Sequence, residues 1–348
     1  MSANPEMPRA RALASVTVLL WCLLPALAPA GETEKKAAAA RAYLTTVQPD
    51  AELQKLLDAT VKKLLARDSR ARKATTVGIA LIDLQPGQAP RLAHWNGNTP
   101  IYPASVVKFV YLIAAYAWEE QGILSIDGPL DRQLTAMIYK SSNTATQKVF
   151  RKLTETEAGP ALPPDDYANF RERRLRVERW LESLGVTGIH SVHPTYNGGG
   201  DLYGRDIQLL QDGSMTGGIS NESGNYNNRQ AMTAVGTAKL LALLASDLGL
   251  DPEDAAEVRQ RMKRDPRKQR YLYNRIAGGA VQTTGVEVYS KTGTWGPIYA
   301  DAGIIRGPSG RQLALAVFID SKPAYRGKFI AELAKACTAA LLGPKATL

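Results

Sequence analysis

The sequence predicts an α+β fold with three layers (α/β/α), in which helices flank an antiparallel sheet. Two observations support this prediction. Strand patterns occur near both ends of the 348-residue chain, whereas mostly helical patterns fill the block between about residues 122 and 279. One more helix pattern follows the last strand pattern. We therefore expect one sheet assembled from both chain ends, with an all-helical domain inserted between its halves.

The N-terminal part supplies the first half of this sheet. Residues 50–67 carry leucine and valine at helical spacing and predict a helix. Residues 76–84 predict a strand that ends before Pro86-Gly87, and residues 91–95 predict its hairpin partner. The alanine- and charge-rich residues 32–42 before them predict a loose helix or a tail.

The rest of the chain is mostly helical and then returns to strands. We expect helices at 105–121, 147–153, 167–184, 231–248 and 252–262. Residues 194–228 are crowded with Gly, Asn, Ser and Tyr, and an irregular stretch of that length inside a domain is often functional. The chain closes with strands at 286–291, 300–306 and 313–320 and a helix at 328–342.

The first 30 residues predict a secretory signal peptide. Arg9 and Arg11 precede a short apolar run, and Ala28-Pro29-Ala30 provides an A-x-A cleavage site. The run is too short to cross a bilayer comfortably, so we expect a secreted or periplasmic protein with no stable membrane span after cleavage. The mature chain then has an N-terminal tail (31–48) and one catalytic domain (49–348), with its α/β part at about 49–121 and 280–348 and its helical part at about 122–279.

Composition argues against several classes of partner. The net charge is +10, but the basic residues are scattered in small clusters such as 263–268, which we interpret as solvated helix faces. They lack the interleaved aromatic residues of a nucleic-acid surface, so we expect no nucleic-acid partner. Cys337 alone remains after signal cleavage, and His190 and His193 have no acidic partner at metal-site spacing. We therefore expect no metal, no cofactor and a monomer.

The chemistry-bearing pattern begins at Ser105. The stretch PASVVKFV places this serine at a helix N-terminus and Lys108 three residues later, on the same helix face. The helix body, 109–118, is almost wholly apolar and therefore buried, and a buried lysine has a lowered pKa that lets it accept a proton. This pattern predicts a nucleophile with its base or proton relay. The alternative is a capping serine followed by a surface lysine.

Two further motifs follow in order. Ser141-Ser142-Asn143 is an S-x-N motif just before a helix, and Lys291-Thr292-Gly293 is a K-T-G motif at the end of a strand. The ordered set S-x-x-K, S-x-N and K-T-G is found in serine β-lactamases and penicillin-binding proteins. From about residue 50 to its end, the sequence resembles the class A β-lactamase-like serine hydrolases of the β-lactamase/penicillin-binding transpeptidase superfamily. The flanking sequences MIYKSSNTAT and YSKTGTWGPIYADAGIIRGPSG also resemble that family.

The resemblance implies the β-lactamase/transpeptidase fold and a catalytic role for three residues. Ser105 Oγ is expected to attack a carbonyl and to form an acyl-enzyme. Lys108 is expected to accept or relay the proton, and Ser141 to carry it onward to the leaving nitrogen.

The resemblance also implies the substrate-binding residues. Asn143 is expected to bind a substrate amide and to orient Lys108. Lys291 and Thr292, with Thr294, suit a substrate carboxylate, and Gly293 completes the K-T-G motif. The backbone N–H groups of Ser105 and Thr294 are expected to form the oxyanion hole.

Two departures concern the closer assignment to class A. Ser141 follows Ser105 at a shorter spacing than class A enzymes usually have, so a stretch that lines one edge of the cleft is missing. The E-x-x-L-N pattern that carries the deacylating glutamate is absent before 231–248. Glu222 is the nearest candidate for this base, followed by Asp212 and Asp201; the alternative is that Glu222 is a solvated loop carboxylate. Without such a base, acylation occurs but deacylation is slow.

These observations predict an exported serine hydrolase, similar to class A β-lactamases, that hydrolyses a β-lactam or related amide and acts in antibiotic resistance. Its substrate is then a small-molecule β-lactam or a peptidoglycan-type peptide. One alternative is a D,D-peptidase, penicillin-binding protein or esterase; another is a binding protein with a degenerate site. A Ser-His-Asp enzyme is disfavoured because the chain has no G-x-S-x-G motif, so we interpret His94, His190 and His193 as surface or packing residues.

Overall fold

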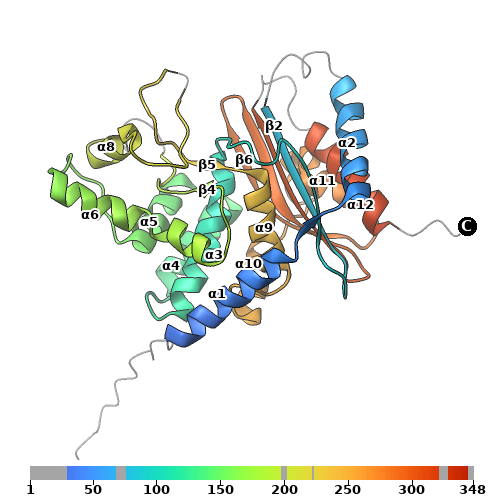
Figure 1. The fold of residues 1–348 in the computed structure, drawn as a ribbon, viewed down its shortest axis with the longest axis horizontal. Coiled ribbons are helices and arrows are strands. Elements are labelled where there is room, and N and C mark those ends of the chain that lie inside the picture. The colour runs from blue at the N-terminus through green and yellow to red at the C-terminus, as the bar shows by residue number, and fades with distance from the viewer. Residues whose placement is uncertain (1–29, 68–75, 197–201, 222, 321–327, 344–348) are drawn as a thin grey trace, which may run out of the picture.

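The protein forms a main sheet with helices on its two faces, and beside it a largely helical part that contains a second sheet of two short strands (Figure 1). The structure is a computed structural model that describes residues 30–67, 76–196, 202–221, 223–320 and 328–343. The expected signal peptide lies outside these residues, apart from Ala30 at its end. Within the described ranges, no helix is both long and apolar enough to cross a membrane.

The sheet has six strands and joins the two ends of the chain, as the sequence predicts. Its strand order is β1-β3-β2-β8-β7-β6. The strands are β1 (Gln48–Pro49), β2 (Thr76–Leu84), β3 (Arg91–Trp95), β6 (Glu287–Trp295), β7 (Ile298–Arg306) and β8 (Gln312–Asp320). The N-terminal strand β2 pairs along its full length with the C-terminal strand β8, and all pairs except β1 with β3 are antiparallel.

Both faces of the sheet are buried, because alternate residues of each strand point to opposite sides. Ile79 and Leu81 of β2 belong to one core cluster, and Ala80 and Ile82 belong to another. The first cluster is covered by α2 (Ala51–Ala66), η2 (Arg270–Asn274), α11 (Ile276–Ala280) and α12 (Lys328–Leu342). The second is covered by α9 (Ala234–Ala245) and by the helix that follows Ser105. The predicted three-layer α+β class is therefore confirmed.

The helical part surrounds α3 (Lys108–Glu120), which is preceded by the 3-10 turn η1 (Ala104–Val107). Every residue of α3 from Lys108 to Trp118 is buried, as an all-round apolar helix requires. The surrounding elements are α4 (Gly128–Tyr139), α5 (Asn143–Thr154), α6 (Pro164–Arg174), α7 (Arg176–Ser183), β4 (Ile189–His190), α8 (Arg205–Gln211), β5 (Ala231–Met232) and α10 (Pro252–Met262).

Several predicted elements agree with the structure residue for residue, namely β2, β3, α10 and α12. Others were wrong in detail. The expected single helix 167–184 is two helices, α6 and α7, which meet at Leu175. The expected helix 231–248 begins as strand β5, and the stretch 194–228 contains α8 and a bridge between Ile219 and Arg229. In the last two places, backbone groups form hydrogen bonds with residues distant in sequence, namely β5 with β4 and Ile219 with Arg229. Periodicity alone does not reveal such pairs.

The expected tail is also a packed element. Residues Ala30–Thr45 form helix α1, and its Ala37, Ala40 and Leu44 are buried in the same core cluster as α9. Because small alanines let a helix approach its neighbour closely, the alanine-rich composition serves packing here. Helix α9 itself packs on strands β2 and β8, although it lies within the range 122–279 that we expected to be the helical part.

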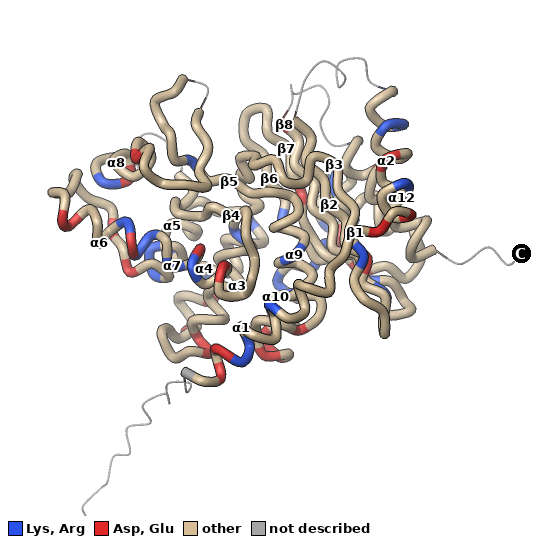
Figure 2. The backbone as a smooth tube through the Cα atoms, in the orientation of Figure 1, with Lys and Arg blue, Asp and Glu red and all other residues tan. Residues whose placement is uncertain are grey.

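Charged residues of both signs are interspersed over the helices (Figure 2). The largest fully buried side chains nevertheless include Arg174, Lys108 and Lys291. Buried charged groups are costly unless they are paired or change their protonation, so they mark places where the fold serves something other than packing.

Candidate active site

Ser105 lies on a tight turn between the sheet and α3. Ala104 has a φ of 48°, in the left-handed region that residues with a Cβ rarely adopt. Strand β6 lies directly against this turn, because a Cβ added to Gly293 would meet Pro103 O at 2.6 Å and Ser105 N at 3.2 Å. The glycine of the K-T-G motif is therefore required by close approach of two backbones. The motif lies inside β6, rather than at the strand end where we expected it.

Lys108 is fully buried at the first position of α3. Its Nζ donates hydrogen bonds to Ser141 O (2.6 Å) and Asn143 Oδ1 (2.6 Å), and lies 3.5 Å from Ser141 Oγ. Burial lowers the pKa of Lys108 from 10.5 to about 7. Among the described residues, Ser105 Oγ has no hydrogen-bond partner, so the predicted contact with Lys108 is not formed here. Catalytic hydrogen bonds often tighten only when substrate binds.

The S-x-N motif is held by the start of α5. Ser142 is the N-cap residue and its hydroxyl accepts a hydrogen bond from Ala145 N (3.2 Å). Ser141, with a φ of 55°, turns its hydroxyl and carbonyl toward the two lysines of the site. Asn143 is fixed at both ends of its amide, because Nδ2 also donates to Tyr196 O (3.1 Å). The motif therefore holds the Lys108 amine through Ser141 O and Asn143 Oδ1.

Lys291 is buried in the middle of β6. Its Nζ donates to Ser141 Oγ (2.9 Å) and to Thr292 O (2.9 Å). Burial lowers the pKa of Lys291 well below its ordinary value, and the nearby Lys108 and Arg264 lower it further. Ser141 Oγ thus lies between the amines of Lys108 and Lys291. This arrangement is a ready path for a proton.

Two buried arginines that the sequence did not single out support β6. Arg264 donates from Nε to Ser290 O (2.8 Å) and from Nη2 to Ile138 O (2.9 Å). Arg275 donates to Thr294 Oγ1 (2.6 Å) and to Ala300 O (2.7 Å). Arg264 belongs to the basic cluster 263–268, so the interpretation of that cluster as a solvated face was wrong for this residue. No local signal marks either arginine, because each is buried by elements distant in sequence.

A cavity of about 440 Å³ opens beside Ser105. Asn143 of the S-x-N motif and Thr294, which follows the K-T-G motif, line it together with residues of the stretch 194–228. The remaining lining residues are Tyr102, Ala104, His193, Pro194, Thr195, Tyr196, Leu202, Leu210, Tyr226, Arg229, Gln230 and Trp295. The described part of that stretch therefore forms one wall of the cleft. The described lining residues include no Asp or Glu.

Of the three candidate deacylation bases, Asp212 is the one that lies among the described residues, and it does not line this cavity. Glu222 and Asp201 lie outside the described residues. Asp212 accepts a hydrogen bond from the Tyr167 hydroxyl (2.7 Å) and one from Ser214 N (2.9 Å), and it does not line the cavity. Asp212 therefore connects the residues that follow α8 to Tyr167 of α6.

The two buried histidines are engaged in packing networks. His190 Nε2 lies 2.6 Å from Asn228 Oδ1, and His193 Nε2 lies 2.7 Å from Asn228 O. His190 Nδ1 also lies 2.9 Å from Glu178, so it does have an acidic partner, contrary to our expectation. Helix α7 brings this carboxylate close from a different element. Both nitrogens of the His190 ring therefore have protein partners.

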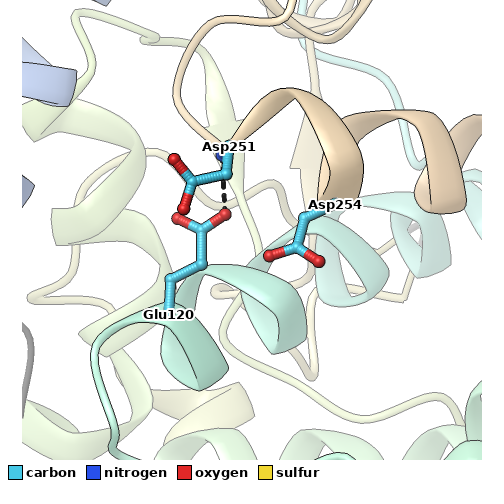
Figure 3. Close-up of side chains that lie close together, drawn as sticks. All are labelled: Glu120, Asp251 and Asp254. Atoms are coloured by element: carbon cyan, nitrogen blue, oxygen red, sulfur yellow. Dashed lines mark hydrogen bonds between the residues drawn. The ribbon is translucent and has the colours of Figure 1, made fainter. Parts of the chain in front are cut away.

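One group of carboxylates could hold a cation by its geometry. Glu120, Asp251 and Asp254 lie within 4.8 Å of one another at the far end of α3 (Figure 3). Lys36 of α1 already donates to Glu120 Oε2 (2.7 Å) and lies 2.8 Å from Asp251 Oδ2. The protein thus provides its own positive charge at this place.

This chain matches the model of a known protein family and is similar in fold to solved structures. The model of the beta-lactamase enzyme family matches residues 129–341, which contain the S-x-N and K-T-G motifs but begin after Ser105 and Lys108. No curated protein sequence matches the chain.

Three solved structures illustrate the likeness in fold. PBP-A, solved as a point mutant in an acyl-enzyme complex with penicillin G, is 17% identical with a TM-score of 0.55, over 84% of this chain and 97% of that one. The TLA-1 extended-spectrum β-lactamase is 19% identical with a TM-score of 0.58, over 83% and 99%. A β-lactamase from Sphaerobacter thermophilus DSM 20745 is 17% identical with a TM-score of 0.56, over 82% and 96%.

These identities establish the fold, and the family match adds membership because it spans more than half of the chain. It includes both motifs that surround the Lys108 amine. The chain therefore belongs to the beta-lactamase enzyme family.

Proposed function

We propose that the protein is an exported serine hydrolase that opens a β-lactam or a related amide through an acyl-enzyme on Ser105. The observation that carries this proposal is the buried amine of Lys108, held by Ser141 and Asn143 beside the cavity that Ser105 lines. A lysine with a pKa of about 7 is neutral in about half of the molecules at neutral pH and can accept a proton.

The acylation step uses three side chains. Ser105 Oγ attacks the substrate carbonyl carbon, and its proton passes to Lys108 Nζ as the new ester bond forms. The amide C–N bond then breaks, and the leaving nitrogen receives a proton through the Ser141 hydroxyl, which lies between both lysine amines. Water must afterwards hydrolyse the ester to release the acid and to return the proton to Ser105.

Charge that develops on the carbonyl oxygen needs donors. The backbone N–H groups of Ser105 and Thr294 are the candidates, since β6 lies against the Ser105 turn at Gly293. Removing one such donor typically reduces kcat about 100- to 1,000-fold. The carboxylate of the substrate is assigned to Lys291 and Thr292, and its arrival favours the protonated form of Lys291.

A second candidate function has its own supporting observation. The described lining of the cavity carries no carboxylate that could activate the deacylating water. A penicillin-binding peptidase that keeps a long-lived acyl-enzyme is this second candidate, and the lifetime of the adduct on Ser105 distinguishes it from a fast β-lactamase.

Penicillin labelling followed by mass spectrometry tests the proposal and separates the candidates. We expect wild-type protein to gain the mass of one penicillin on Ser105, and Ser105→Ala to gain none. Rapid loss of the adduct favours a β-lactamase, whereas an adduct that survives for many minutes favours a penicillin-binding peptidase. Equal labelling of the mutant would remove Ser105 as the nucleophile, and an unlabelled wild type would favour a binding protein with a degenerate site.

A further inference from the structure

A second cationic group faces the cleft and is not used by the reaction described above. Arg229 lines the cavity beside Ser105. Its guanidinium lies over the ring of Tyr102 at 4.3 Å and over the ring of Trp295 at 5.2 Å. The two rings themselves pack edge to face at 5.6 Å. We call these three residues the arginine–aromatic clamp.

The clamp is held in place by the backbone around it. Arg229 forms a two-way backbone bridge with Ile219, at 3.1 and 3.0 Å. Its neighbours are buried and fixed, since Asn228 donates to Leu209 O (3.0 Å) and Gln230 donates to the Tyr111 hydroxyl (2.7 Å). One side of the guanidinium also interacts with the Tyr102 hydroxyl, and an arginine that stacks on aromatic faces keeps the other donors on its edge available. The clamp therefore presents a preorganised cation to the cavity.

The charge of Arg229 is not matched by the protein around it. Among the described residues, Arg229 forms no ion pair, whereas the buried Arg174 pairs with Asp206 and the buried Arg275 donates to Ala300 O. Trp295 remains 57% exposed, so the clamp is open to a ligand. Planar bidentate recognition of a carboxylate is the chemistry that a guanidinium edge serves best.

The position of the clamp tells which part of a substrate it meets. Lys291, Thr292, Thr294 and Trp295 follow one another along β6, and Thr294 shares the cavity with Ser105. Residues rise about 3.3 Å along a strand, so Thr292 and Trp295 are about 10 Å apart along β6. The two cationic groups thus flank Ser105 at different points of the strand. A substrate that places one carboxylate at Lys291 and its reactive carbonyl at Ser105 directs its acyl side chain toward the clamp.

We infer that Arg229 is a specificity-determining residue that binds a carboxylate on the acyl side chain of the substrate, so that acyl donors with two carboxylates are preferred. This inference rests on the proposed acylation of Ser105. It names the substrate class as dianionic β-lactams, or peptides that carry a free carboxylate on the acyl side of the bond to be broken.

Two penicillins that differ by one group provide the test. One has a phenylacetyl side chain, and the other has the same side chain with an added α-carboxylate. We measure the second-order rate constant of Ser105 acylation for both, in wild type, Arg229→Met and Arg229→Lys. A charge-assisted hydrogen-bond pair corresponds to about tenfold or more. We expect Arg229→Met to lower the ratio of the acylation rate constant for the dianionic penicillin to that for the monoanionic penicillin by about that factor. Arg229→Lys should keep most of the wild-type ratio.

The controls separate the possible failures. If Arg229→Met slows both penicillins equally, or neither, Arg229 is a packing residue and the inference is wrong, although the proposed function stands. If neither penicillin acylates wild type at Ser105, the proposed function itself fails. Ionic strength gives a readout that needs no variant: the wild-type ratio must fall as salt rises, and a ratio independent of salt overturns the inference even if Arg229→Met does not fold.

Discussion

The two ends of helix α3 carry opposite charges in opposite settings. Lys108 begins the helix within a group of cations, and Glu120 ends it within a group of carboxylates (Figure 3). A helix N-terminus is partly positive and its C-terminus partly negative, so both end residues oppose the helix dipole. One helix therefore carries an unfavourable charge at each end, and the question is what stabilises each of them.

At the C-terminal end the protein itself supplies the missing charge. Lys36, from the distant helix α1, contacts Glu120 and Asp251. At the N-terminal end, Lys108 and Lys291 contact neutral oxygen atoms of Ser141, Asn143 and Thr292.

Asp301 is the buried carboxyl group near the cationic end, and burial raises its pKa. A carboxyl group whose acid form is favoured offsets less of the positive charge. A carboxylate cluster that the protein partly compensates with its own lysine is a structural contact, whereas a cationic cluster left without its counter-charge is suited to an anionic ligand. Charge balance thus distinguishes the two ends more clearly than residue type does.

The largest expected effect is on the acylation rate, when Lys108 is removed and compared with the removal of Lys36. Lys108→Met should lower the rate of Ser105 acylation by penicillin about 100- to 10,000-fold, since it removes the proposed proton acceptor. Lys36→Met is the matched control, because it deletes a partly buried lysine of α1 that contacts the other end of α3. It should leave the acylation rate within about twofold.

Acylation kinetics of both variants, with circular dichroism to confirm folding, decide the comparison. An unchanged rate in Lys108→Met would show that another group accepts the proton. An equal loss in both variants would show that the effect passes through α3 as a whole.

The pH profile of acylation is the next effect in size. Lys108 must be neutral to accept a proton, and its pKa is lowered to about 7 because it is buried. The rate should therefore rise about tenfold per pH unit below 7 and level off above it. A profile of the acylation rate from pH 5 to 9 checks this. Only adducts that hydroxylamine cleaves are counted, because a serine ester is cleaved by hydroxylamine. A rate that keeps rising toward pH 10 would indicate a lysine with an ordinary pKa.

The sequence identified the cationic end much better than the acidic one. Ser105, Lys108, Ser141 and Lys291 were found because a short motif carries each of them, and the structure gathers the two lysine amines around the Ser141 hydroxyl. Lys36 was assigned to a loose helix or tail, since nothing local shows that an alanine-rich segment packs on the core.

The clamp and the two buried arginines were missed for the same reason. Arg229 gains its meaning from Tyr102 and Trp295, which are far from it in sequence. Arg264 stood in a charge cluster that looked solvated, yet it connects α4 with β6. Periodicity predicts which residues are apolar and inward, but it gives no information on which polar groups a fold brings together.

A smaller effect, on stability, is expected at the acidic end. Lys36→Met removes the cation between Glu120 and Asp251 and leaves like charges facing one another. Loss of a hydrogen bond to a charged group costs about 1.5–3 kcal/mol, and partial exposure of Asp251 places the expected loss at the lower end. Urea denaturation at pH 7 measures it. A free energy of unfolding equal to that of wild type would mean that α1 is held by its apolar face alone.

Asp254 gives the smallest effect and the sharpest contrast with Lys108. Burial, with the nearby Glu120, raises the pKa of Asp254 from 3.8 to about 7. The folded state therefore holds this proton more tightly than the unfolded state, so the stabilising contribution is complete below about pH 4, declines as pH rises, and is lost above about pH 7. Asp254→Asn keeps a neutral group there at every pH. Its melting temperature should approach and then exceed that of wild type between pH 4 and 7, by a degree or two, because the carboxyl is partly in water. A constant difference between the two melting temperatures across this range would mean that Asp254 titrates normally. In that case the acidic end would be held by Lys36 alone.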